Sequence, residues 1–77
     1  MLIRVKSFAD LRAYTTHLPS DGELAIDDGT TVETVLKKLA VPADTNYIIL
    51  VNGRHQNQRY VLQPGDDLVF FSPMEGG

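Results

Sequence analysis

Residues 64–77 read Pro-Gly-Asp-Asp-Leu-Val-Phe-Phe-Ser-Pro-Met-Glu-Gly-Gly. Proline followed by glycine is typical of a turn, and the apolar run behind it predicts a strand over residues 67–72. The remaining residues show neither helical nor strand periodicity and finish with two glycines. We therefore expect one compact domain over residues 1–72 and a flexible diglycine tail over residues 73–77.

This last strand carries apolar side chains on both of its faces. Leu68 and Phe70 point one way and Val69 and Phe71 the other, because successive side chains alternate across a strand. Since a single helix covers only one face of a sheet, one of these pairs is expected to lack internal cover. The functional interpretation is a docking patch for a partner protein, with Phe71 and Val69 as candidates. Cover by a loop is the alternative.

Earlier segments complete the pattern of a small mixed sheet. Apolar periodicity predicts strands over residues 1–8, 23–27, 47–51 and, more weakly, 54–58. The third of these is apolar at successive positions, like the last strand, and Asn52-Gly53 behind it is a strong signal for a tight turn. With a helix after the second strand, this order predicts an α+β fold. We expect a mixed sheet of four to five strands with one main helix packed on one face.

The helix is indicated by its cap and by its apolar stripe. Thr30-Thr31-Val32-Glu33 fits a capping box, in which the Thr30 hydroxyl accepts from a free amide and Glu33 reaches back. Apolar residues recur at the spacing of one helical face, at Val32, Val35, Leu36 and Leu39. Pro42 is expected to end the helix.

Length and composition exclude several functions. A chain of 77 residues forms one small domain with little room for a deep pocket, which argues against a self-contained enzyme. The absence of cysteine excludes a disulfide scaffold, a thiolate metal site and a cysteine nucleophile. The net charge of −3 and the scattered basic residues argue against nucleic acid as a partner. The acidic pairs Asp27-Asp28 and Asp66-Asp67 are interpreted as solvated turn residues, or alternatively as contacts to a basic partner.

Other sites and locations are equally unsupported by the sequence. His17 and His55 lie far apart in a chain without cysteine, so no metal site is expected. The sequence contains no nucleophile elbow and no phosphate-binding loop. No apolar run approaches the ~20 residues that cross a bilayer, and no signal-peptide pattern follows Met1. We expect a cytoplasmic protein without a membrane partner.

Several segments, taken together and in order, resemble the ubiquitin-like sulfur-carrier family. They are Ser7–Arg12, Gly29–Val32, Val51–Gly53 and the run 64–77. The resemblance covers essentially the whole chain and implies the ubiquitin-like β-grasp fold. The family includes the small subunit of molybdopterin synthase and the sulfur carrier of thiamine-thiazole synthesis. The Phe-Ala-x-Leu-Arg pattern that begins at Phe8 is more similar to the former.

The resemblance implies that Gly77 is the reactive residue. A ubiquitin-activating-type adenylating enzyme would activate its carboxylate with ATP, and a sulfur donor would displace AMP to leave a thiocarboxylate. The sulfur would then pass to a cofactor precursor in a complex with the large synthase subunit or, in the thiazole pathway, with thiazole synthase. No cofactor is expected on the carrier, because the ATP and the catalytic groups belong to the partner.

The tail residues suit this chemistry. An α-carboxylate is ionised at neutral pH without a general base. Gly76 and Gly77 have no Cβ and can pass through a narrow channel, while Pro73 limits flexibility where the tail leaves the sheet. An extended tail of five residues reaches roughly 17 Å. Met74 and Glu75 would then contact the partner on the way into its active site.

Two other functions remain open at this point. Glu75 beside the glycines leaves room for a protein modifier that is joined to lysines through Gly77. A β-grasp binding module that acts only through its sheet face, with an incidental tail, is the third possibility. Neither the pathway nor the final sulfur acceptor follows from the sequence.

Overall fold

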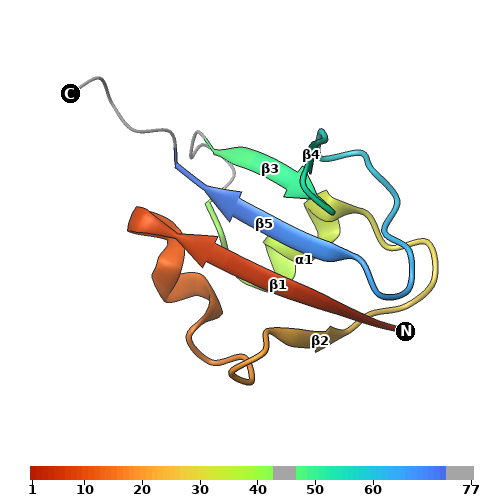
Figure 1. Ribbon diagram of the computed structural model, residues 1–77, viewed down its shortest axis with the longest axis horizontal. Helices are drawn as coiled ribbons and strands as arrows, with labels where there is room; N and C mark the ends of the chain where they lie inside the picture. The colour runs from red at the N-terminus through yellow and green to blue at the C-terminus, as the bar shows by residue number, and fades with distance from the viewer. Residues whose placement is uncertain (43–46, 73–77) are drawn as a thin grey trace.

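The computed structural model describes residues 1–42 and 47–72, apart from the side chains of Ala9 and Asp10. Its sheet has five strands in the order β2-β1-β5-β3-β4 (Figure 1). In chain order the elements are β1 (Leu2–Phe8), the 3₁₀ helix η1 (Ala9–Thr15), β2 (Glu23–Ala25), α1 (Val32–Lys38), β3 (Ile48–Val51), β4 (Arg54–His55) and β5 (Asp67–Phe71). No helix within the described ranges is long and apolar enough to cross a membrane.

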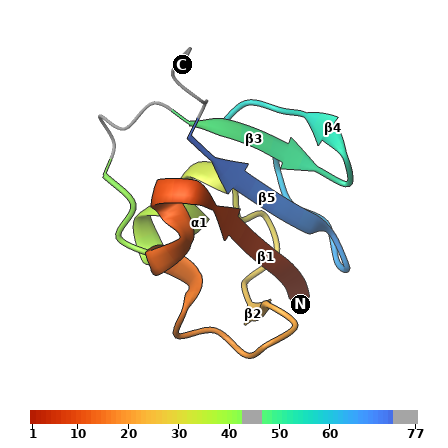
Figure 2. The ribbon, with the colours of Figure 1, turned by 60° about the vertical axis from the view of Figure 1, so that its left-hand side comes forward.

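The sheet is mixed because β5 has a different relation to each neighbour. It runs parallel to β1 and antiparallel to β3. The two outer strands, β2 and β4, pair antiparallel with β1 and β3. Figure 2 shows α1 on one side of this sheet. The predicted α+β fold, with a mixed sheet and one main helix, is confirmed.

The core lies between the sheet and α1. Phe70 and Leu68 of β5 are 0% exposed, and they are joined by inward-facing residues of β1, β3 and α1, which include Ile3, Val5, Ile49, Val51, Val35 and Leu36. The predicted apolar stripe of the helix is therefore buried along its whole length. Burial of each such side chain stabilises the fold by about 1.5–3 kcal/mol.

The helix begins one residue later than its capping box predicts. The N-cap is Thr31, whose Oγ1 accepts from the Thr34 amide at 3.3 Å. Thr30 instead donates its hydroxyl to the Asp27 carbonyl at 2.6 Å and closes the preceding turn. The prediction that Thr30 caps the helix was wrong, because this turn already engages its side chain.

The helix ends through its own backbone before it reaches Pro42. The Val41 amide donates to the Leu36 carbonyl at 3.0 Å, and the Ala40 amide donates to the Lys37 carbonyl at 3.0 Å. With Ala40 at φ 63°, these two bonds form a Schellman motif, so Pro42 is not what stops α1. Glycine is the usual residue at this left-handed position.

Three elements differ from their predicted form. The 3₁₀ helix η1 was not predicted, because its seven residues mix polar and apolar side chains and are too few to show a helical period. The strands β2 and β4 are shorter than the predicted 23–27 and 54–58. The Asn52-Gly53 turn is as predicted, and positive φ angles of 54° and 80° fit the primed turn that joins β3 to β4.

Asp66 is a buried structural carboxylate rather than a solvated turn residue. It accepts from the Gln63 amide at 2.8 Å and from Asn52 Nδ2 at 2.9 Å, and the Tyr60 hydroxyl donates to it at 3.4 Å. Asn52 in turn accepts from the Asp67 amide at 2.9 Å. Both interpretations of the Asp66-Asp67 pair were therefore wrong for Asp66, which ties the β3–β4 turn to the start of β5.

The pKa of the Tyr60 phenol is raised by burial and by this carboxylate. Removal from water, and then the charge and hydrogen bond of Asp66, raise the pKa of Tyr60 above its ordinary value. The fold therefore favours the neutral phenol over the phenolate.

Replacing Asp66→Ala should lower the free energy of unfolding by about 1–3 kcal/mol, because three part-buried hydrogen bonds lose their acceptor. Urea denaturation at pH 7 measures this change. The adjacent Asp67→Ala is the matched control, since Asp67 is exposed and its backbone keeps both bonds to Asn52. We expect less than about 1 kcal/mol from it. Equal effects of the two variants would contradict the structural role of Asp66.

Replacing Ala40→Gly should raise the free energy of unfolding by about 0.5–1 kcal/mol, because the change removes the strain of a Cβ at positive φ. The control Ala13→Gly lies in η1, where φ is not positive, and should cost up to about 1 kcal/mol. Urea midpoints of both variants measure these shifts. A loss of stability in Ala40→Gly would show that Ala40 is not strained.

Candidate functional site

The face of the sheet opposite α1 carries partly exposed apolar side chains. We call it the outer face. Val69 and Phe71 alternate with the buried Leu68 and Phe70 of β5, so they point to this face. Both are only partly buried, which shows that no described loop covers them fully.

Strand register places two other apolar residues beside Phe71. Its partner on β1 is Phe8, which is 53% exposed, and its partner on β3 is Ile48. Neighbouring strands lie about 4.8 Å apart, so these three side chains form one continuous row across the sheet. The row lies at the end of β5 from which the chain continues into residues 73–77.

The next row is apolar at its centre and basic at its ends. Val69 lies between Lys6 on β1 and Leu50 on β3, and Leu50 is paired with His55 on β4. Phe8, Ile48, Leu50, Val69 and Phe71 together form what we call the apolar patch. Lys6 borders the patch as a cation on a long stem, able to cover apolar surface with its methylenes.

Charged residues limit the patch on the side away from the tail. Asp67 is paired with Arg4, and Arg4 is paired with Glu23 on β2. This row alternates in sign, whereas Lys6 has no carboxylate at its paired position on β5. A partner surface that is apolar, with a carboxylate facing Lys6, would complement the patch.

The predicted site residues fall into two groups. Val69 and Phe71 lie together on the outer face at the end of β5. Pro73, Met74, Glu75, Gly76 and Gly77 lie outside the described residues, and their roles stay predictions. The patch is adjacent to the last described residue, Ser72, from which the chain continues toward them.

Sequence reasoning missed the part of the site that β1 supplies. Phe8 and Lys6 lie on the same face of β1 as Arg4. In the sequence, these alternating positions resemble an ordinary solvent-exposed face of a strand. Only the parallel register of β1 with β5 brings Phe8 next to Phe71. Continuous apolar sequence in β3 was the available signal for Ile48 and Leu50.

The side chains around the patch are mainly apolar, with charged residues at its border. Within residues 1–42 and 47–72, no group of three His, Asp or Glu side chains is placed to hold a metal ion. A contiguous apolar patch that is partly exposed is typical of a protein-binding surface.

Comparisons with solved structures give the fold a precedent. The crystal structure of SAMP1 from Haloferax volcanii is similar with a TM-score of 0.75 and 22% identity, over 100% of both chains. That of H. volcanii small archaeal modifier protein 1 has a TM-score of 0.72 and 21% identity, over 95% of this chain and 98% of that one. The solution structure of the H. volcanii HVO 2177 protein has a TM-score of 0.72 and 25% identity, over 100% of this chain and 87% of that one.

These likenesses confirm the predicted ubiquitin-like β-grasp fold. No curated protein sequence matches the chain. The model of the ThiS family, however, matches residues 5–77, which include every residue of the apolar patch. The chain belongs to the ThiS family of ubiquitin-like sulfur carriers.

Proposed function

We propose that this chain is a sulfur carrier that delivers sulfur as a thiocarboxylate on Gly77 in molybdopterin synthesis. The observation that carries the proposal is the family match, which runs from β1 through the apolar patch to residue 77. A tail that reacts and a sheet face that docks are then joined at one point, the end of β5. In this proposal the chain is a substrate and subunit, and its partners perform the catalysis.

The reaction has two steps. First, a carboxylate oxygen of Gly77 attacks the α-phosphate of ATP, which forms an acyl-adenylate and releases pyrophosphate. Second, a sulfur nucleophile from the donor attacks the acyl carbon and expels AMP. When the donor supplies sulfur at the oxidation level of sulfide, this sulfur replaces the oxygen that leaves with AMP, and neither an oxidant nor a reductant is needed. These steps use cytoplasmic ATP and a ubiquitin-activating-type enzyme, which is why we place the carrier in the cytoplasm.

The apolar patch supplies binding energy for a tail that must be ordered. Fixing five tail residues in one conformation costs about 5–10 kcal/mol, at ~1–2 kcal/mol per residue. At ~25 cal/mol per Å², this cost is offset by burying about 200–400 Å² of apolar surface. The five side chains of the apolar patch, which include Val69 and Phe71, can supply an area of that order. Docking of the patch would therefore let the tail enter a narrow site without a large loss of affinity.

The molybdopterin pathway is preferred because of the segment that forms η1. Its Phe-Ala-x-Leu-Arg pattern resembles that of the molybdopterin synthase small subunit, and its Leu11 is anchored in the core. The large synthase subunit would then be the second partner. If thiazole synthase accepted the thiocarboxylate form and the large subunit did not, the chain would belong to the thiazole pathway instead.

A protein modifier is the second candidate function. Two of the similar structures are those of SAMP1 and of small archaeal modifier protein 1, which favours testing it. A modifier would be joined to lysines through the same activated Gly77. Proteins of the cells that make this chain would be cleaved with a glutamate-specific protease, which cuts after Glu75. Mass spectrometry would then reveal diglycine remnants on lysines that disappear when its gene is deleted. If none disappear, the modifier function is excluded under the conditions sampled.

Deleting Gly77 should abolish thiocarboxylate formation and leave the urea midpoint unchanged, because the core between the sheet and α1 is built from other residues. The assay combines the protein with its adenylating enzyme, ATP and a sulfur donor. Intact mass then reports a gain of about 16 Da, which fragmentation must assign to Gly77 rather than to oxidised Met1 or Met74. The same mixture without ATP is the control and should not gain this mass at Gly77, because oxidation of methionine does not depend on ATP. Modification of the Gly77 deletion would contradict the proposal.

Replacing Phe71→Ala should lower kcat/KM for adenylation by about tenfold to a hundredfold, which corresponds to ~1.4–2.8 kcal/mol of lost docking energy. The value of kcat should change little, because the tail and the ATP site are unaltered. Leu2→Ala is the matched control, since Leu2 is 53% exposed on the outer face but pairs with Ala25 at the far end of β1. If the control lowered kcat/KM as much as Phe71→Ala, docking would not depend on the patch.

A further inference from the structure

The edge of β1 that faces β2 is paired along only part of its length. β1 has seven residues, and β5 pairs with it from Arg4 to Phe8. On its other edge β2 pairs only from Leu2 to Arg4. The last bond on that edge is from the Val5 amide to the Gly22 carbonyl at 2.8 Å, after which the two segments separate.

The part of this edge beyond β2 carries the backbone amide of Ser7, a residue that is 6% exposed. The Arg4 amide donates toward β5, to the Asp66 carbonyl at 2.9 Å, and the Val5 amide donates the opposite way. Since backbone groups alternate along a strand, the Ser7 amide points to the same edge as that of Val5. None of the hydrogen bonds outside the strand ladders, among the described residues, uses the Ser7 amide.

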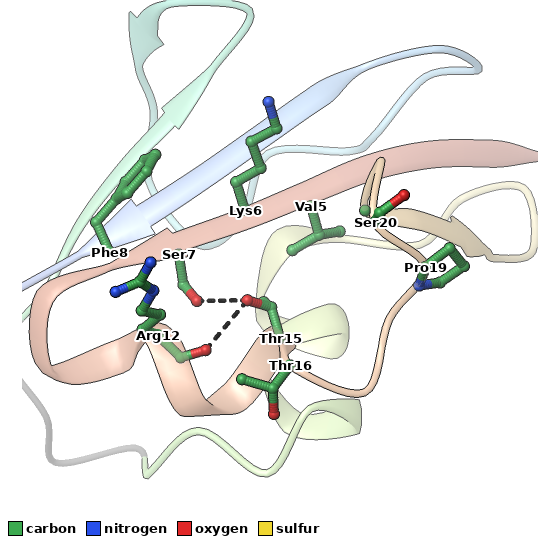
Figure 3. A pocket seen from close by; sticks show the side chains of 10 residues that line it. Val5, Lys6, Ser7, Phe8, Arg12, Thr15, Thr16, Pro19 and Ser20 are labelled. Atoms are coloured by element: carbon green, nitrogen blue, oxygen red, sulfur yellow. Dashed lines mark hydrogen bonds between the residues drawn. The ribbon is translucent and has the colours of Figure 1, made fainter.

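A groove of about 250 Å³ lies along this edge. Its floor is β1 from Val5 to Phe8, and its far wall is the segment that leads from η1 to β2, with Thr16, Pro19 and Ser20 (Figure 3). Ser7 Oγ and Thr15 Oγ1 share a hydrogen bond at 2.8 Å, which holds the end of η1 against the strand. Four strand residues span roughly 10 Å at ~3.3 Å per step, a length that suits an extended peptide.

The charged side chains that line the groove favour an acidic ligand. Lys6 and Arg12 line it, and none of the described side chains that line it is acidic. Figure 3 shows Lys6 rising from one side of β1 and Arg12 approaching the same strand from η1. In a chain with a net charge of −3, this is a local excess of positive charge. Two cations on different sides of one strand suit a chain with several carboxylates better than a single small anion.

We propose that the groove binds an extended acidic segment of a partner protein, which adds to β1 as a strand beyond the end of β2. The Ser7 amide donates to a carbonyl of this segment, and its carboxylates pair with Lys6 and Arg12. In strand addition of this kind, main-chain hydrogen bonds provide the affinity and side-chain contacts provide the specificity. The groove meets the apolar patch at Phe8 and at the bordering Lys6, but the proposed binding does not use Gly77, so it goes beyond the proposed carrier function.

The test is an NMR titration of the full-length ¹⁵N-labelled protein with a capped five-residue peptide of alternating glutamate and valine. We expect the Ser7 amide resonance to shift on binding and its exchange with solvent to slow at least tenfold at saturation. The same peptide with lysine for glutamate, or with proline at its central position, should bind at least tenfold more weakly. These peptide arms use the unaltered protein, so they do not depend on the folding of any variant.

A pair of charge-reversed proteins makes the test specific. The double variant Lys6→Glu and Arg12→Glu should bind the acidic peptide at least tenfold more weakly. The control Lys37→Glu and Lys38→Glu makes the same change of net charge on exposed positions of α1 and should bind normally. The Gly77 deletion should also bind normally, which separates this proposal from the carrier function.

Several results would overturn the proposal. Equal affinity for the lysine and glutamate peptides would remove the charge argument. Peptide shifts confined to Val69 and Phe71 would assign the binding to the apolar patch. If inorganic phosphate alone reproduced the Ser7 shift and the proline peptide bound as well as the parent, the groove would be a simple anion site.

Discussion

Every part of the described structure depends on β5 being held between β1 and β3. Side chains alternate along any strand, so those of β5 point in turn to the face that α1 covers and to the face that it leaves open. Phe70 and Leu68 fill the core, and Val69 and Phe71 are consequently placed on the outer face. The same register aligns Phe8 and Ile48 with Phe71. The apolar patch, our proposed docking surface, is thus a by-product of how the core is built.

The two ends of β5 are fixed by different means. At its start, the buried Asp66 carboxylate and the Asn52 side chain connect the 63–66 turn to the β3–β4 turn. At its end, Phe71 is flanked by strands on both sides, and the chain then continues toward the reactive terminus that we propose. The fold thereby offers a rigid base for that terminus. The half-used edge of β1 adds a second, differently charged surface nearby.

Sequence alone predicted the α+β class, the helix stripe and the double-faced character of β5, because these follow from local periodicity. It placed the helix cap at Thr30 instead of Thr31, since two adjacent threonines offer the same chemistry and only the fold chooses between them. The burial of Asp66 and the exposure of Phe8 could not be predicted either. Both depend on partners distant in the chain, Asn52 and Phe71, that only strand register brings together.

The central position of β5 also has a mechanical meaning. A tail that is drawn into another enzyme pulls on Ser72, and the pull passes directly into a strand with ladders on both of its edges. A force along the strand axis loads many hydrogen bonds of these ladders together in shear, whereas a force on an edge strand would peel them apart in turn. Under the proposed function, the carrier could therefore be pulled at Gly77 in repeated cycles while its body stays folded.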